Sequence, residues 1–432
     1  MSGSASNSEV FQPGWERLDD GAVVGSWWQP SSKSGRLDCL LCPRECSLAE
    51  GGRGFCFVRE NRDQKIVLST YGRSTGFCID PIEKKPLNHF FPGSAVLSFG
   101  TAGCNLGCQY CQNWDISKSR ETQRLSQKAQ PDQIAQAAQS TGCKSVAFTY
   151  NDPVIWAEYA IDTARACQQL GIKSVAVTAG YISPGAREEF FRWMDAVNID
   201  LKAFTEEFYR KITYSHLQPV LDTIRYVVRE TPVWIELTNL IIPGLNENPD
   251  DLRRMCDWIV NELGDGVPIH FTAFHPDFRM TDRERTDPSA LERAFEIALQ
   301  AGVKFPYVGN VQDADRQSSN CPGCSALLIE RIGYQIGLYQ LEVDESDEVG
   351  RCRNCQLVLP GRFDRNKGTW GSKRQPIRIS DYAASPGGTR LRSVVSSSRS
   401  NQESAVTSSS HSPSTQAAPA VSVGAKQLNL SR

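Results

Sequence analysis

Cysteine is the residue type in this chain whose number and spacing most clearly predict chemistry. The chain has 432 residues and 15 cysteines, most of which fall into three clusters. An odd number of cysteines does not suit a disulfide framework, and a reducing compartment keeps thiols unpaired, so the clusters predict metal sites. The cysteines outside the clusters are interpreted as small buried hydrophobic side chains: Cys78, Cys143, Cys167 and Cys256.

A glycine-rich run after an apolar segment carries the cluster Cys104, Cys108 and Cys111. Three thiolates so close in sequence can hold three irons of a [4Fe–4S] cluster and leave the fourth iron open to a chelating ligand. Glycines let the backbone wrap such a cluster closely. The alternative is a structural zinc site that a distant fourth ligand completes.

Two Cys-x2-Cys pairs near the carboxyl end form another cluster, Cys321, Cys324, Cys352 and Cys355. Paired turns of this kind place two thiolates on each side of one tetrahedral ion, and the β-rich segment between them favours a zinc ribbon. Iron is the alternative metal, either as a single rubredoxin-like ion or as an iron–sulfur cluster.

The amino-terminal cluster, Cys39, Cys42, Cys46 and Cys56, has a less diagnostic spacing. Its surroundings are rich in Gly and Arg and have little helical periodicity, which indicates a small loop-rich module. The cysteines predict either a zinc site or an auxiliary iron–sulfur cluster, and scattered free thiols are the alternative.

Short apolar segments alternate with helix-compatible segments over residues 93–310. Strands regularly separated by helices form βαβ units, so we expect an α/β fold with a parallel sheet. The segments expected to be strands are residues 95–100, 145–151, 174–180, 196–202, 233–242 and 269–275. Those expected to be helices are residues 153–170, 219–230, 250–262 and 289–301.

Several of these strands carry small or polar residues on one face and apolar residues on the other. Buried parallel strands are usually apolar on both faces, so a polar face predicts a cavity and hence a partial (β/α) TIM-type barrel. The polar residues gather toward the carboxyl ends of the strands, where barrel enzymes place their active sites. The faces expected to line the cavity carry Ser145, Ala147, Thr149 and Asn151, then Ser174, Ala176, Thr178 and Gly180, and then Ala196, Asn198, Asp200 and Lys202.

The Cys-x3-Cys-x2-Cys loop, with Tyr110 before its last cysteine, resembles the radical S-adenosylmethionine (SAM) superfamily. Stretches around Thr178, Asp200 and His275 resemble those of pyruvate formate-lyase activating enzymes. Residues 36–365 resemble still more closely the radical enzyme of the AmmeMemoRadiSam group, in the motifs Cys-Leu-Leu-Cys-Pro-Arg-Glu-Cys and Phe-Thr-Tyr-Asn-Asp-Pro and in the paired Cys-x2-Cys turns.

The resemblance implies an enzyme that binds a [4Fe–4S] cluster through Cys104, Cys108 and Cys111 and SAM on the open iron. An electron from a donor such as a flavodoxin or ferredoxin would cleave SAM to a 5′-deoxyadenosyl radical, which would abstract hydrogen from an unidentified substrate, with a protein among the candidates. The residues expected to bind the cofactor are Tyr110, Asn151, Asp152, Thr178, Asp200, Lys202 and His275.

Some of these assignments have a purely structural alternative. Asp200 and Lys202 would equally suit a solvated ion pair at a strand end. His275, like His270 on the same predicted strand, would equally suit a core histidine whose hydrogen bonds are satisfied.

Composition limits the remaining possibilities. Hydrophobic residues make up 40% and charged residues 22% of the chain, no apolar run is long enough for a bilayer, and the amino terminus lacks a secretory pattern, so we expect a cytoplasmic protein without membrane contact. The expected segments are an unassigned polar stretch (1–30), a cysteine-rich module (31–92), the barrel (93–310), a zinc-ribbon-like module (311–376) and a disordered Ser-rich tail (377–432).

A zinc-stapled scaffold that binds RNA or protein is the rival hypothesis. The net charge of −2 gives no global basic field, but residues 351–378 are locally basic and are a candidate RNA contact, with a solvated linker as the simpler interpretation. Among enzymes, activation of a glycyl-radical protein ranks below general hydrogen abstraction, because the extra cysteine modules exceed a minimal activating enzyme.

Overall fold

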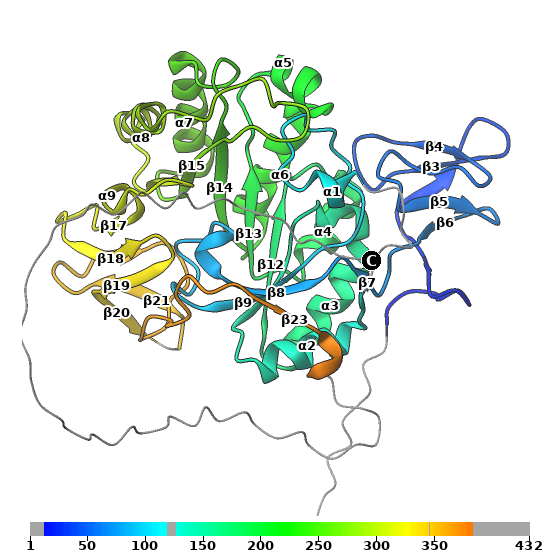
Figure 1. The fold of residues 1–432 in the computed structure, drawn as a ribbon, viewed down its shortest axis with the longest axis horizontal. Helices are drawn as coiled ribbons and strands as arrows, with labels where there is room; N and C mark the ends of the chain where they lie inside the picture. Colours follow the sequence, from blue (N-terminus) through cyan, green and yellow to red (C-terminus); the bar gives the residue numbers. More distant parts are fainter. Residues whose placement is uncertain (1–12, 119–126, 345, 383–432) are drawn as a thin grey trace, which may run out of the picture. The chain divides into compact units, whose positions relative to one another are not determined.

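A nine-stranded sheet organises the computed structural model, which describes residues 13–118, 127–344 and 346–382 (Figure 1). Neighbouring strands from β9 to β16 run parallel, and β8 and β23 continue the sheet antiparallel at one edge. The end strands do not pair with each other, so the predicted partial barrel is confirmed. The order is β16 (Pro306–Gly309), β15 (Ile269–Ala273), β14 (Trp234–Ile241), β13 (Ala196–Asp200), β12 (Lys173–Thr178), β11 (Ser145–Phe148), β9 (Ala95–Phe99), β8 (Phe77–Pro81) and β23 (Gln375–Ile377).

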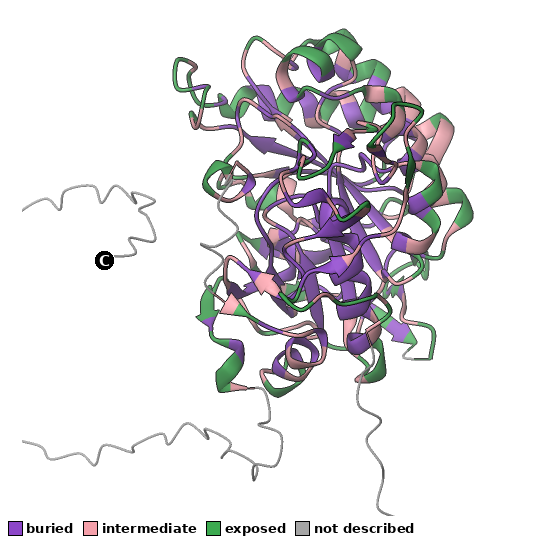
Figure 2. Cartoon of the chain, turned by 90° about the vertical axis from the view of Figure 1, so that its right-hand side faces the viewer, coloured by how far each residue is buried: buried purple, intermediate pink, exposed green. Residues whose placement is uncertain are grey.

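Helices between the parallel strands pack on one side of the sheet, and their outer faces are exposed while the strands are buried (Figure 2). They are α2 (Pro131–Ser140), α3 (Ala157–Gln169), α4 (Pro184–Phe191), α6 (Leu217–Glu230), α7 (Pro249–Leu263) and α8 (Pro288–Ala301). Shorter helical turns are η1 (Ile82–Lys84), α1 (Trp114–Ser117), η3 (Pro153–Trp156), α5 (Glu206–Phe208), the π-helical η4 (Tyr209–Thr213), α9 (Ala314–Gln317) and η5 (Ile379–Asp381).

Local sequence signals fix the ends of these helices. The Asn248 side chain accepts hydrogen bonds from the first backbone N–H groups of α7, and Asp287 does the same for α8. Both helices end at glycines with positive φ, Gly264 and Gly302. No helix within the described ranges is long and apolar enough to cross a membrane.

The register of the sheet corrects the predicted face of β12. Ala147 pairs with Val175 and Val175 pairs with Ala196, so these three residues share the inner face, where they pack against Phe90 and Phe91. The predicted inner face of this strand, with Ser174, Ala176, Thr178 and Gly180, is therefore the outer one. A shift of one residue moves every side chain of a strand to the other face, and the sequence of the strand alone does not fix that shift.

The amino-terminal module contains two three-stranded sheets and a short bridging pair. It differs from the expected range 31–92 in two ways. Residues 23–24 and 28–30, to which no element was assigned, form short strands, and β8 belongs to the large sheet. Its elements are β1 (Val23–Val24), β6 (Lys65–Leu68) and β5 (Arg59–Arg62), then β2 (Trp28–Pro30), β3 (Arg36–Cys39) and β4 (Ser47–Ala49), then β7 (Arg73–Ser74) with β10 (Gln127–Lys128).

The carboxy-terminal module has two small sheets around its own apolar core, which includes Leu328, Ile329 and Leu341. Its side chains also reach the barrel, since Arg331 Nη2 donates a hydrogen bond to Asn88 O. The strands are β17 (Ser319–Asn320), β18 (Leu327–Ile332) and β19 (Gln335–Tyr339), and β20 (Leu341–Asp344), β21 (Val349–Cys352) and β22 (Val358–Leu359).

The predicted tail boundary at residue 377 needs correction, because β23 pairs with β8 and both Ile377 and Ile379 are buried. The rest of the predicted tail, residues 383–432, lies outside the described residues. We expect truncation after Tyr382 to leave the thermal midpoint unchanged, because that sequence has little apolar surface to bury. Truncation after Pro376 should lower the midpoint by several degrees, since it removes the last residue of β23 and two buried Ile side chains, Ile377 and Ile379. Equal midpoints in a calorimetric comparison of the two truncations would contradict this boundary.

Candidate functional site

Residues 100–113 form the loop that carries Cys104, Cys108 and Cys111, and it leaves the carboxyl end of β9. Its backbone is fixed to the segment after β13: Gly107 N donates to Thr213 O at 2.8 Å, and Gln109 N donates to Ile212 O at 3.0 Å. The three cysteines therefore lie at the carboxyl edge of the parallel sheet, the edge predicted for the site.

At two glycines of this loop, neighbouring atoms lie so close to the backbone that a side chain would collide with them. Gly103 has a φ of +84°, and a Cβ at this position would collide with the carbonyl oxygen of Cys56. A Cβ at Gly107 would lie 2.7 Å from Tyr214 Cδ2. The loop thus packs directly against both the amino-terminal module and η4, as the glycine-rich sequence predicts.

The three thiols of this loop do not form the compact ligand group of a single-ion site. Among the described residues, only the four carboxy-terminal cysteines form a group whose ligand atoms all lie within 4.8 Å of one another. Thiolates that bind different irons of one cluster remain farther apart than thiolates around one ion. Burial raises the pKa of Cys108 to about 12.

Asn151 anchors the cysteine loop to the end of β11. Its Oδ1 accepts a hydrogen bond from Thr101 N at 3.0 Å, and its Nδ2 donates to Gly103 O at 2.8 Å and to Ala102 O at 3.2 Å. Asn151 is 5% exposed. The Asn151 side chain, which the sequence predicts to contact the cofactor, thus makes its hydrogen bonds to the loop backbone.

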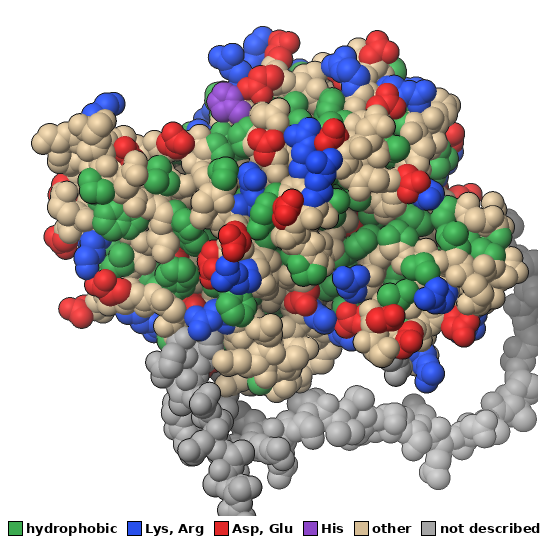
Figure 3. Space-filling model, turned by 180° about the vertical axis from the view of Figure 1, so that it is seen from behind, with side chains coloured by type: hydrophobic (Ala, Val, Ile, Leu, Met, Phe, Trp, Pro, Cys, Tyr) green, Lys and Arg blue, Asp and Glu red, His purple; other side chains and the backbone are tan. Residues whose placement is uncertain are grey.

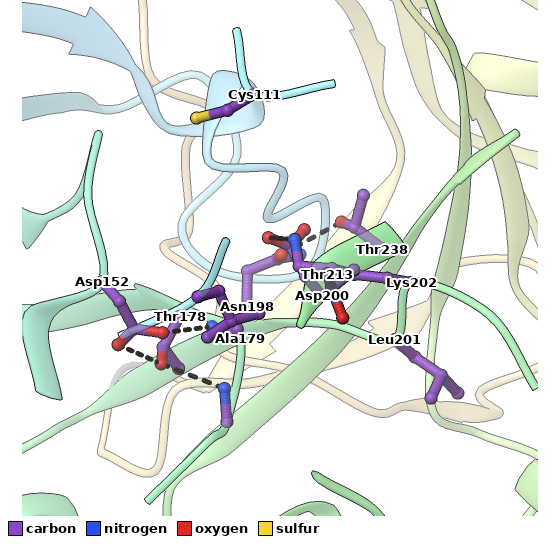
Figure 4. Close-up of polar contacts among 12 residues, drawn as sticks. Cys111, Asp152, Thr178, Ala179, Asn198, Asp200, Leu201, Lys202, Thr213 and Thr238 are labelled. Carbon is purple, nitrogen blue, oxygen red and sulfur yellow. Dashed lines mark hydrogen bonds and ion pairs between the residues drawn. The ribbon is translucent and has the colours of Figure 1, made fainter. Parts of the chain in front are cut away.

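Asp152 joins the ends of β11 and β12. Its carboxylate accepts hydrogen bonds from Val154 N at 3.0 Å, Thr178 Oγ1 at 2.9 Å and Ala179 N at 3.0 Å. Burial raises its pKa, and these hydrogen bonds oppose the rise. Asp152 and Thr178 therefore position the strand ends beneath the loop (Figure 4).

Lys202 and Asp200 form an ion pair of 2.9 Å near the same edge. Burial opposes the charge of Lys202, but attraction to Asp200 and to Tyr110 raises its pKa well above the usual value, so the ammonium stays charged. Lys202 Nζ lies 6.0 Å from the centre of the buried Tyr110 ring. Asp200 and Lys202 lie across from Cys111 in Figure 4, so a partly buried cation is available beside the cysteine loop.

His275 lies beyond β15, on the solvent side of the cysteine loop. Its Nδ1 is 3.0 Å from Gln112 Nε2, and its side chain is 45% exposed. The same segment holds the loop elsewhere: Asp277 Oδ1 accepts from Trp114 Nε1 at 3.1 Å, and Arg279 N donates to Gln109 O at 3.0 Å. His275 is thus neither a core histidine nor buried with the thiols.

The barrel interior below this edge is occupied by a buried polar network. Glu236 accepts hydrogen bonds from His270 Nε2 at 2.7 Å and from the backbone N–H groups of Asn88 and His89. His89 Nε2 lies 2.6 Å from Tyr307 Oη. His270 therefore has the structural role of a core histidine, and the polar cavity predicted for the barrel is filled at this level by residues 82–91.

Arg44 is a residue of the site that sequence reasoning did not select. Its guanidinium donates hydrogen bonds to Asn105 O and Tyr214 O, which ties the amino-terminal module to the cysteine loop and to the end of η4. Lys118 Nζ supports the loop from the other side, through Leu106 O at 2.7 Å. The only signal for Arg44 was its place in the Cys-Leu-Leu-Cys-Pro-Arg motif.

The two other cysteine clusters differ in compactness. In the carboxy-terminal module Cys321 Sγ is 3.5 Å from Cys355 Sγ, and Cys324 Sγ is 3.7 Å from Cys352 Sγ. These spacings suit four ligands around one tetrahedral ion. The amino-terminal cysteines line a single cavity but form no such compact group: Cys39, Cys42, Cys46 and Cys56.

Residues 99–259 match the family model described as the Radical SAM superfamily. An uncharacterised protein of Methanocaldococcus jannaschii is 37% identical over 341 residues, which cover 79% of this chain and 96% of the relative. A pyruvate formate-lyase-activating enzyme of Clostridium pasteurianum is 25% identical over 210 residues, 45% of this chain and 86% of that enzyme. Among solved structures, a radical SAM methyltransferase from Sphaerobacter thermophilus matches with a TM-score of 0.42 and 12% identity, over 69% of this chain and 78% of its own.

Proposed function

The chain belongs to the radical SAM superfamily, and we propose on this premise that Cys104, Cys108 and Cys111 hold a [4Fe–4S] cluster with which the enzyme cleaves SAM reductively. When bound, the cluster and SAM together supply a 5′-deoxyadenosyl radical that abstracts hydrogen from the substrate. The observation that carries the proposal is the three-thiol loop anchored at the carboxyl edge of a parallel sheet.

The residues around the loop have separate tasks in this proposal. Asn151 and Arg44 hold the loop backbone, and Asp152 with Thr178 fixes the strand ends beneath it. Lys202 keeps its charge beside Tyr110 and is proposed to bind the anionic carboxylate of SAM, with Asp200 as its positioning partner. A carboxylate bound in this buried setting is held away from water, which strengthens its ion pair.

The matched activating enzymes favour a protein as the substrate class. The pyruvate formate-lyase-activating enzyme of Clostridium pasteurianum and a putative glycyl-radical enzyme activating enzyme of Methanocaldococcus jannaschii, 22% identical over 214 residues, both match part of this chain. Glycyl-radical activation is therefore the second candidate function. A one-electron donor of the ferredoxin or flavodoxin class is the partner that either function requires.

The rival scaffold hypothesis rests on the basic stretch between residues 351 and 378. Several of its cations have partners within the protein: Arg353 Nε donates to Leu341 O at 3.1 Å, and Lys367 Nζ donates to Ile336 O at 2.8 Å. On the face drawn in Figure 3, basic and acidic side chains are interspersed rather than gathered by sign. These features favour the enzyme over a nucleic-acid scaffold.

Anaerobic reconstitution tests the enzyme directly. Protein loaded with iron and sulfide, then reduced with dithionite in the presence of SAM, should release 5′-deoxyadenosine and methionine, which chromatography measures. Colourless protein that contains only zinc, or brown protein that leaves SAM intact, would contradict the proposal.

We also propose zinc for the compact carboxy-terminal group. Hydrogen bonds from the Asn354 side chain and the Ala326 backbone lower the pKa of Cys324 to about 6, which favours the thiolate that zinc needs. Cys324→Ser with Cys352→Ser should remove about one zinc per chain and make residues 319–359 the first site of protease cleavage. Retained zinc by elemental analysis, or unchanged proteolysis, would contradict this assignment. Cys256→Ala, a buried cysteine on α7, is the matched control and should change neither.

A further inference from the structure

The amino-terminal cysteines surround one cavity beside the cysteine loop. Cys39 ends β3, Cys42 and Cys46 lie on the following loop, and Cys56 lies in the turn before β5. Gly54 also lines the cavity, and a Cβ there would make ordinary contacts of 3.6 Å with Cys56 Sγ and 3.8 Å with Cys46 Sγ. The remaining lining is Leu41, Arg44, Arg59, Asn105 and Ile155.

The spacing of these thiols does not suit a single ion. Two thiolates on one zinc ion, each about 2.3 Å from it, are at most about 4.6 Å apart. No three of these four sulfur atoms lie within 4.8 Å of one another, since the carboxy-terminal group is the only one of that kind among the described residues. The sulfur atoms of Cys104, Cys108 and Cys111 likewise do not all lie within 4.8 Å of one another. A group in which each thiolate binds its own iron fits both sets.

The charges around the cavity suit an anionic occupant. A [4Fe–4S] core bound by four thiolates carries a net negative charge, and two arginines, Arg44 and Arg59, line the cavity. Arg59 is 1% exposed, and although it pairs with Glu158, its Nη1 has no hydrogen-bond partner.

We propose that Cys39, Cys42, Cys46 and Cys56 hold a second [4Fe–4S] cluster, which passes electrons to the cluster at Cys104, Cys108 and Cys111. All four irons of such a cluster have a protein ligand, so it has no open position for SAM, and electron transfer is the task that remains.

Direct contact between the two sites supports the relay. Asn105 follows Cys104 in the chain and lines the amino-terminal cavity, and Arg44 binds its carbonyl oxygen. The carbonyl oxygen of Cys56 packs against Gly103, which belongs to the loop of Cys104, Cys108 and Cys111. In each turnover a ferredoxin- or flavodoxin-type donor gives one electron to the second cluster, reducing it from the 2+ to the 1+ state. That electron then reduces the first cluster, and the second returns to 2+.

Iron counting on the full chain tests the binding step. Anaerobically reconstituted wild-type protein should contain about eight irons and eight sulfides. The triple variant Cys104→Ala, Cys108→Ala and Cys111→Ala should keep about four irons, with an electron paramagnetic resonance signal that SAM does not change. Cys42→Ser with Cys46→Ser should also keep about four irons, but SAM should change its signal. Cys256→Ala is the control and should keep about eight.

The outcomes separate this proposal from the proposed function. About four irons in the wild type, a triple variant without iron, or a second zinc per chain would overturn the second cluster. If Cys42→Ser with Cys46→Ser does not fold, the triple variant still decides the matter. Wild type with about eight irons that leaves SAM intact would overturn the proposed function but not the second cluster.

Electron transfer from the second cluster to the first rests on the proposed function, and a separate experiment measures it. Cys42→Ser with Cys46→Ser should form 5′-deoxyadenosine at least about tenfold more slowly than wild type with reduced flavodoxin as donor. With dithionite, a small reductant that reaches the first cluster directly, the rates should agree within about twofold. Equal rates with flavodoxin would overturn the relay.

Discussion

Replacing Cys104, Cys108 or Cys111 singly by Ala is expected to abolish SAM cleavage. Each thiolate holds a different iron in the proposed cluster, so the loss of one opens a second labile corner. Changes to groups that only support a metal ligand typically cost about 10- to 100-fold in affinity or activity, and the loss of a ligand itself should exceed that. The measurement is 5′-deoxyadenosine formation by anaerobic protein with dithionite.

Metal content controls this experiment. Each single variant should keep the zinc proposed for the carboxy-terminal module, because Cys321 and its partners belong to a module with a separate core. Cys256→Ala again serves as the matched cysteine control and should cleave SAM at the wild-type rate. Near-normal cleavage by any of the three Ala variants would show that the cysteine concerned is not a cluster ligand.

Asn151→Ala should reduce both cluster retention and SAM cleavage by about 10- to 100-fold, although this residue need not touch the cofactor. The substitution leaves the buried Thr101 N–H and the carbonyl oxygens of Ala102 and Gly103 without their partner. Each such unsatisfied group costs about 1–3 kcal/mol, so the loop should detach from the end of β11 before the rest of the fold unfolds. Iron content after gel filtration and the rate of 5′-deoxyadenosine formation measure the two effects.

Two further variants test the role of Asn151 as a positioning residue. Asn151→Asp keeps the acceptor for Thr101 N but faces two carbonyl oxygens with a carboxylate, so it should be no better than Asn151→Ala. Tyr159→Phe removes a different buried hydrogen bond, the one that the Tyr159 hydroxyl on α3 donates to Ala129 O at 2.7 Å. It should lower the thermal midpoint but retain iron. Full iron content in Asn151→Ala would contradict the anchoring role.

The elements of the barrel could largely be predicted because their signals are local. Proline at the start of α7 and α8 and glycine at their ends mark those helices in the sequence. β16 was missed because Pro306 and Gly309 interrupt its short apolar run, and β8 was missed because it lies in a Cys- and Gly-rich stretch. The face of β12 was wrong by one residue, since register depends on the neighbouring strands rather than on the strand itself.

The sequence by itself determined which cysteines belong together, because ligands close in the chain report their grouping through spacing alone. It also determined the order of strands and helices, which depends on periodicity over neighbouring residues. Only the tertiary structure decided what each group around the cysteines does. Asn151 reaches the loop across 48 residues and Arg44 reaches Tyr214 across 170, and such contacts depend on how the sheet brings distant segments together. Distances between thiols likewise follow from packing, so only the structure separates the compact carboxy-terminal group from four cysteines that line one cavity without forming such a group.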